Sequence, residues 1–198
     1  MKARKRVIGI FLAVVVLCIG VGFAALADDL TVDGTVAVKS STFDDTFDGY
    51  IFFSNGAVDE TATTVTDKTA VTVGVANDDD GDANDKLTIA IGEAAFTAVD
   101  QVVVVTANIE NSSPTNDANV AVTNFRNSAT FPDPADTDAP FTVGSFEVSI
   151  ALSNDGTVVR NNGTDNGTIT VTITVKLTKL PTADESGVFG FKLTATAV

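Results

Sequence analysis

The chain has 198 residues and a formal net charge of −14, and it contains no histidine, no tryptophan and a single cysteine, Cys18. So acidic a surface repels nucleic acids and anionic lipids, and a chain without histidine lacks the usual zinc ligand and the general base of most hydrolytic triads. The length is sufficient to bury a core as one domain without disulfide bridges.

The first 27 residues are typical of a secretory signal peptide, with a basic start and a long apolar run. Ala25 and Ala27 supply the small residues that a signal peptidase recognises, and the polar Asp28 follows, so cleavage is expected after Ala27. An uncleaved anchor is the alternative, because an apolar run of this length could also span a bilayer. Cleavage would remove Cys18 and leave residues 28–198 as a single domain without thiols.

Beyond the signal, the chain is rich in valine and threonine, which favour strands, and its apolar residues recur at every second position. The pattern predicts strands over residues 30–39, 49–53, 69–76, 86–91, 101–110, 118–125, 141–152, 167–177 and 188–198. We therefore expect an all-β fold, a jelly-roll-like β-sandwich of about 8–10 strands.

Local composition adds detail to this plan. Residues 54–56, Ser-Asn-Gly, are expected to form the turn that ends the second strand. The consecutive valines of 101–110 favour burial on both faces in the middle of a sheet, with 118–125 as the hairpin partner. The proline-bearing segment 131–140 is expected to cross from one sheet to the other, and 93–100 to form a helical turn or a bend.

The acidic stretch 77–85 is the one segment that could bind a metal. Calcium takes several oxygen ligands around a turn that glycine can tighten, and Gly81 stands at its centre. The alternating side chains that could bind calcium are Asp78, Asp80, Asp82 and Asn84. The stretch departs from the EF-hand pattern, because Ala76 replaces its first ligand and Leu87 its bidentate glutamate. A solvated acidic hairpin loop is therefore the alternative.

Catalysis by paired carboxylates and N-glycosylation are two further chemistries on which the sequence bears. The 26 acidic residues show no spacing that singles out a catalytic pair, so we expect no enzymatic activity and no cofactor. Asn-x-Ser/Thr triplets at Asn111, Asn162 and Asn166 fall in expected loops, where a host that glycosylates such sites could modify them.

Both ends of the chain resemble a known family. The residues that carry the resemblance are GFAALADDLTVDGTVAV at 22–38, TITVTITV at 168–175, LPTADESG at 180–187 and FKLTATA at 191–197. They are similar to the corresponding stretches of TasA and camelysin-type surface proteins of Gram-positive bacteria, while the middle of the chain departs freely. The resemblance implies export through a dedicated signal peptidase, a jelly-roll fold and assembly into fibres of the extracellular biofilm matrix.

The resemblance and the sequence together suggest a mode of assembly. An open sheet edge can accept a strand from a neighbouring chain. We expect the first mature strand to insert into the next subunit and to build a filament, with four residues filling the groove: Leu30, Val32, Val36 and Val38. The same strand could instead pair within its own domain. The alternative function is a monomeric cell-surface binding module, and a glycan ligand is disfavoured because Tyr50 is the only tyrosine.

Overall fold

The computed structural model describes residues 30–40, 50–76, 84–126, 140–161, 163–181 and 185–198. These residues form strands and two short 3-10 turns, η2 (Lys68–Ala70) and η3 (Ser153–Gly156), and among them no helix is long and apolar enough to cross a membrane. The strands are β1 (Leu30–Ser40), β2 (Ile51–Val58), β3 (Val71–Ala76), β4 (Lys86–Ile91), β5 (Val102–Asn111), β6 (Ala118–Arg126), β7 (Phe141–Val143), β8 (Phe146–Leu152), β9 (Thr157–Val158), β10 (Gly167–Leu177) and β11 (Glu185–Ala197). The predicted all-β class is confirmed.

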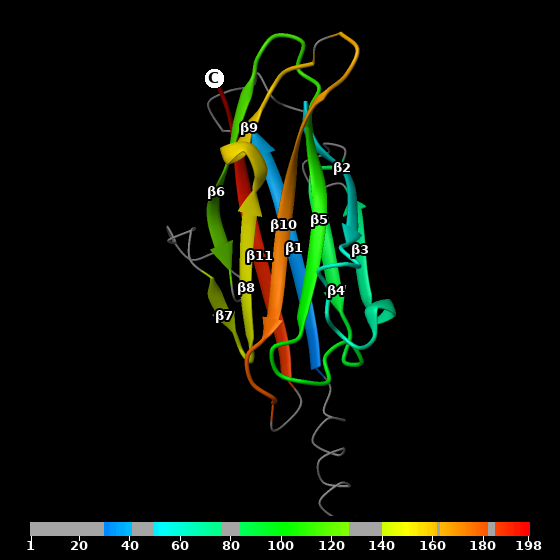
Figure 1. Cartoon of the computed structure of the whole chain (residues 1–198). Coiled ribbons are helices and arrows are strands. Elements are labelled where there is room, and N and C mark those ends of the chain that lie inside the picture. Colours follow the sequence, from blue (N-terminus) through cyan, green and yellow to red (C-terminus); the bar gives the residue numbers. More distant parts are fainter. Residues whose placement is uncertain (1–29, 41–49, 77–83, 127–139, 162, 182–184) are drawn as a thin grey trace, which may run out of the picture.

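The strands form two sheets that lie face to face (Figure 1). Sheet A has six strands in the order β3-β4-β1-β11-β6-β9, and sheet B has five in the order β2-β5-β10-β8-β7. Every described pair is antiparallel except β1 and β11, which run parallel. The strand that begins the described chain is therefore an inner strand of sheet A.

One hydrophobic core lies between the two sheets. Its largest fully buried side chains are Phe53, Phe146, Phe189, Leu87, Ile89, Ile91, Ile109, Ile169, Ile173, Leu177 and Leu193. β10 shows how the sequence builds this core, because its isoleucine and valine positions are buried while the intervening threonines are partly exposed. Removal of this apolar surface from water is the main stabilising contribution to the fold.

The valine run of β5 is buried on both faces, whereas from Thr106 onward only every second residue is buried. β5 lies between β2 and β10, and Val103, Val104 and Val105 are all buried. The segment after β2 continues along the same edge of β5, where the Thr63 hydroxyl accepts the backbone N–H of Val104 at 3.0 Å and donates to the carbonyl oxygen of the same residue at 3.2 Å. The prediction of a central strand from the valine run is confirmed.

The predicted turn at residues 54–56 is wrong, because β2 continues through it to Val58. The register between β2 and β5 shifts between Phe53 and Asn55, and this irregularity lets the strand continue through the turn-like sequence. A Cβ atom on Gly56 would lie 2.5 Å from a methyl carbon of Leu87 in the opposite sheet. The glycine is thus required by close approach of the two sheets and not by a turn.

Two other expectations are corrected by the pairing. β6 lies in sheet A beside β11, so it is not the hairpin partner of β5 in sheet B. The single strand expected over 141–152 is a hairpin of β7 and β8, with a tight turn at Gly144, whose φ is 57°, and Ser145. The connection between β6 and β7 does join the two sheets as predicted, although residues 127–139 lie outside the described part. Residues 93–100 form turns and bends.

Candidate assembly site at the N-terminal strand

β1 occupies the centre of sheet A, with a partner strand on each edge. It pairs in parallel with β11 over its whole length, from Leu30 opposite Glu185 to Ser40 opposite Ala195. On its other edge, residues 32–37 pair antiparallel with β4. The main chain of β1 is therefore hydrogen-bonded on both sides, as expected of a strand that completes a sheet.

The register pairs three of the four predicted assembly residues with buried residues of the neighbouring strands. The predicted residues are Leu30, Val32, Val36 and Val38. Val32 is in register with the buried Ile91 of β4, and Val38 with the buried Leu193 of β11. Val36 is in register with a buried residue on each side, Leu87 of β4 and Phe191 of β11. Leu30 is in register with Glu185 at the start of β11. The structure thus brings the predicted set together on one strand and places that strand within its own domain.

Removing β1 would divide sheet A into two parts. β3 and β4 would remain on one side and β11, β6 and β9 on the other, because β1 is the connection between β4 and β11. The two freed edges would flank a gap over the core, lined by Leu87, Ile89, Ile91, Phe189, Phe191 and Leu193. Unpaired backbone groups and exposed apolar side chains are both unfavourable, so such a gap would favour any strand that fills it.

A carboxylate joins the two sheets at the end where β1 begins. Glu185 lies opposite Leu30 in the register, and its carboxylate accepts hydrogen bonds from the backbone N–H and from the hydroxyl of Ser145, the latter at 2.7 Å. Ser145 is fully buried, and its carbonyl oxygen accepts the backbone N–H of Thr178 at 2.9 Å. Sequence patterns did not reveal this contact, because glutamate at a strand start is ordinarily a solvent-exposed residue.

The Ser145→Ala variant is expected to lower the free energy of unfolding by about 1.5–3 kcal/mol, since a hydrogen bond to a charged group is lost at a buried position. Urea unfolding followed by circular dichroism measures the change. Ser149→Ala on the neighbouring β8 is the matched control, because Ser149 is half-buried and the expected loss is below about 0.5 kcal/mol. Equal losses in the two variants would contradict a role for the Glu185 contact.

The predicted calcium and cleavage residues lie largely outside the described part. Asp78, Asp80 and Asp82 fall there, as do Ala25, Ala27 and Asp28. Asn84 is described, with a φ of 63°, and its carbonyl oxygen accepts the N–H of Phe53 at 2.7 Å. Within the described residues, no group of three or more His, Cys, Asp or Glu side chains is arranged to hold a metal ion. The calcium prediction therefore stays a prediction.

Asn111 is not the exposed glycosylation acceptor that its sequence suggests. Its side chain is fully buried, and its amide nitrogen donates to the carbonyl oxygens of Asn116 at 3.0 Å and Val158 at 3.3 Å. Asn166 is also engaged, because its amide donates to Glu110 at 2.9 Å. Asn162 lies outside the described residues. The Asn111 amide organises the loop between β5 and β6, and burial would prevent its modification in the folded protein.

In the described part of the chain, the pKa values of two surface groups, Lys176 and Asp67, are shifted. A hydrogen bond with Asp100, in which Nζ and Oδ1 are 2.8 Å apart, raises the pKa of Lys176, and the charge of Asp100 acts in the same direction. Hydrogen bonds from the hydroxyl and backbone N–H of Thr69 lower the pKa of Asp67, which begins η2. Both pairs stabilise local surface structure, and neither includes a residue of β1 or of its neighbours β4 and β11.

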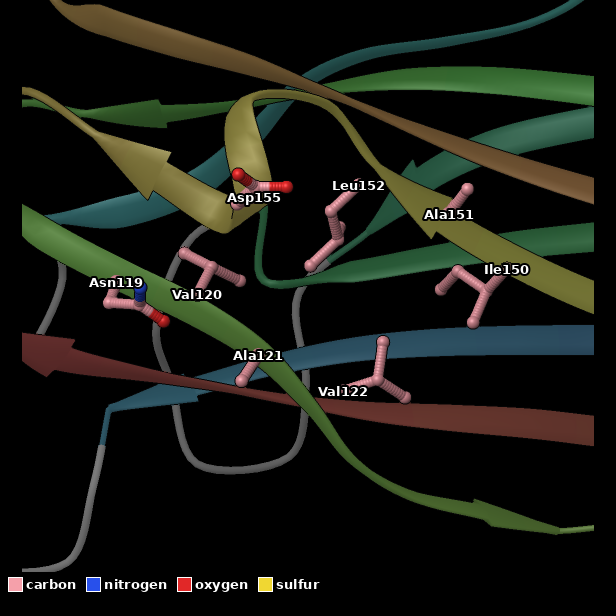
Figure 2. Close-up of a pocket in the computed structure, with 8 residues that line it drawn as sticks. All are labelled: Asn119, Val120, Ala121, Val122, Ile150, Ala151, Leu152 and Asp155. Carbon is pink, nitrogen blue, oxygen red and sulfur yellow. The ribbon is translucent and has the colours of Figure 1, made fainter. Parts of the chain in front are cut away.

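A groove opens between the two sheets on the side of β6 and β8. β9 pairs only with Ala118 and Asn119 of β6, and β7 only with the first residues of β8. Figure 2 shows the side chains of Val122 and Ile150 on the two facing strands, with Leu152 nearby. The residues that line the groove are Asn119, Val120, Ala121, Val122, Ile150, Ala151, Leu152 and Asp155. Polar atoms contribute more of the exposed lining of this groove than apolar atoms do, although most of its side chains are aliphatic.

Neither a protein-family model nor a curated protein matches this sequence. The resemblance of the two chain ends to TasA and camelysin-type proteins therefore stays a prediction from the sequence.

Proposed function

We propose that this protein is a secreted structural subunit of an extracellular matrix, which assembles into fibres by exchange of its N-terminal strand. The observation that supports the proposal best is the place of β1, which comes first in the chain and yet completes the middle of sheet A. The proposed mature protein is residues 28–198 after removal of the signal, with a jelly-roll-like arrangement of its two sheets. Its proposed location is the matrix or the cell surface.

Strand exchange would preserve the contacts seen within one chain. A neighbour's β1 would meet the same edges of β4 and β11 that the subunit's own β1 meets, so closed and exchanged forms differ little in contact energy. Each β1 would remain covalently joined to β2 of its own chain while it pairs with the sheet of another chain. When a subunit accepts its strand from one neighbour and donates its own to a different one, the contact is head-to-tail and can repeat without closing.

The ends of the chain are placed suitably for such a polymer. β1 and β11 run side by side in the same direction, so the chain enters sheet A at one end of the molecule and its C-terminus lies at the other (Figure 1). A donated strand and the last strand of the acceptor would therefore point the same way. A filament built by repeating this contact would therefore have a direction.

Deleting residues 28–38 from the mature chain is expected to abolish filaments, which negative-stain electron microscopy and size-exclusion chromatography would detect. Because the deletion could unfold the body, a second experiment keeps the chain intact. Ala37→Cys and Lys192→Cys variants are mixed, since positions 37 and 192 are in register and the mature chain has no other cysteine. Exchange predicts a disulfide between the two chains. Filaments that survive the deletion, or mixed chains that never cross-link, would contradict the proposal.

The second candidate function is a monomeric surface binding module. Two observations favour it: β1 pairs within its own sheet, and a groove lies between β6 and β8. This alternative predicts a stable monomer, intrachain pairing of β1 at every concentration, and a protein ligand held in the groove. The cross-linking experiment above distinguishes the two functions directly.

A further inference from the structure

Gly34 is the one position of β1 where a side chain could not fit. A Cβ atom built on Gly34 would lie 2.0 Å from Cζ of Phe189 and within 2.5 Å of both neighbouring ring carbons. Gly34 and Phe189 are register partners, and both are buried. The ring of Phe189 thus covers the glycine, as aromatic side chains do beside glycines in sheets.

The ring of Phe189 has little room to move away. It is fully buried and makes an edge-to-face contact with Phe191, at a centroid distance of 6.1 Å. Phe191 in turn makes an edge-to-face contact with Phe141 of β7, at 5.4 Å. Because protein interiors are close-packed, moving the first ring would require the others to move as well. The space above the glycine is therefore set by the accepting sheet.

The apolar pattern of β1 does not select one register by itself. A shift by one residue would turn every side chain to the opposite face, so the core excludes it. A shift by two residues keeps the faces, and valine occupies the positions on either side of the glycine, Val32 and Val36. Either shift would bring a valine to the place opposite Phe189, where not even a Cβ atom fits. Only the observed register brings a residue without a side chain to that place.

We infer that Gly34 and Phe189 together determine the register and the identity of the strand accepted between β4 and β11. The acceptor admits a strand with glycine opposite Phe189 and flanking apolar residues two positions away, which is the sequence of β1 itself. As a rule for strands donated by another copy, this inference rests on the proposed strand exchange; as a rule for pairing within one chain, it does not.

The test is a double-mutant cycle in the mature chain. Gly34→Ala is expected to lower the folded-to-unfolded ratio about tenfold to a hundredfold, because the added methyl group meets the ring. In a Phe189→Ala background, which removes the ring, the same substitution is expected to lower the ratio less than about threefold. Gly74→Ala on β3 is the matched control, since its Cβ atom would meet only the Thr88 hydroxyl, at 3.1 Å. Equal effects of Gly34→Ala in the two backgrounds would overturn the inference.

The register is read separately with pairs of introduced cysteines. Ala37→Cys with Lys192→Cys reports the observed register, and Ala37→Cys with Gly190→Cys reports a shift by two residues, since Gly190 is the partner of Thr35. Gly34→Ala is expected to reduce the first cross-link at least about fivefold, and Phe189→Ala is expected to restore it. An unchanged first cross-link in the Gly34→Ala chain would overturn the inference.

Non-reducing electrophoresis distinguishes the failure of the two proposals. Cross-links in the observed register that join different chains support both the register rule and strand exchange. Cross-links in that register found only within single chains support the register rule and contradict exchange. Interchain cross-links that do not depend on residue 34 contradict the register rule and leave exchange supported.

Discussion

The Phe146→Ala variant is expected to lose about 3–5 kcal/mol of stability, as large aromatic truncations in protein cores do. Phe146 begins β8, has no exposed surface and contacts the ring of Phe96 at a centroid distance of 5.3 Å. Its removal would leave a cavity beneath the turn segment that carries Phe96, and the backbone of β8 is held by β10 and β7, so the site cannot easily collapse. Chemical unfolding measures the difference directly.

The control for this prediction is Val188→Ala on β11. Val188 is 42% exposed, so the loss there should stay below about 1 kcal/mol. Near-equal midpoints for the two variants, with unchanged denaturant dependence, would show that the Phe146 side chain does not lie in the core.

The Asn111→Ala variant is expected to lose about 2–4 kcal/mol, because several buried hydrogen bonds disappear together. The amide donates to the carbonyl oxygens of Asn116 in the loop and of Val158 in β9, and its oxygen accepts the N–H of Ser113 at 2.9 Å. Ser113 is itself buried, so its N–H would be left without this acceptor away from water. Thermal and urea unfolding should both report the change.

Asn119→Ala provides the matched control, since Asn119 is half-buried on β6 and its loss should be below about 1 kcal/mol. Glycan analysis of protein made in a glycosylating host gives an independent check. Folded protein that carries a glycan on Asn111 would contradict the burial of this side chain.

Strands with strict alternation could be predicted closely from the sequence. The ranges expected for β4 and β10 coincide with the observed ones, and that of β1 differs by one residue. In β4 and β10 apolar residues recur at every second position, and one face meets the core, so the pattern and the environment agree.

Pairing and turns between strands could not be predicted in the same way. The hairpin expected between β5 and β6 was wrong because sequence adjacency is only a tendency, and the two strands belong to different sheets. Residues 54–56 have the composition of a turn, yet the glycine serves close packing against Leu87. The Gly144 turn within 141–152 was missed because phenylalanine and valine on both sides continue the apolar pattern.

The candidate assembly site was also predictable only in part from the sequence. The alternating strand after the predicted cleavage site identified β1 as a separate element with one apolar face. Its partners could not be derived, because parallel pairing with the last strand joins residues more than a hundred positions apart, and local sequence carries no record of that contact. For the same reason the sequence indicated neither the fit of Gly34 against Phe189 nor the contact of Glu185 with Ser145.

By itself the sequence determined the all-β class, most of the strands and the face that each strand buries, since these follow from side-chain periodicity along a pleated backbone. Tertiary structure alone decided the order of the strands, the parallel partner of β1 and the register at Gly34. Those features depend on how side chains distant in the sequence fill a common close-packed volume, and that volume exists only once both sheets have formed.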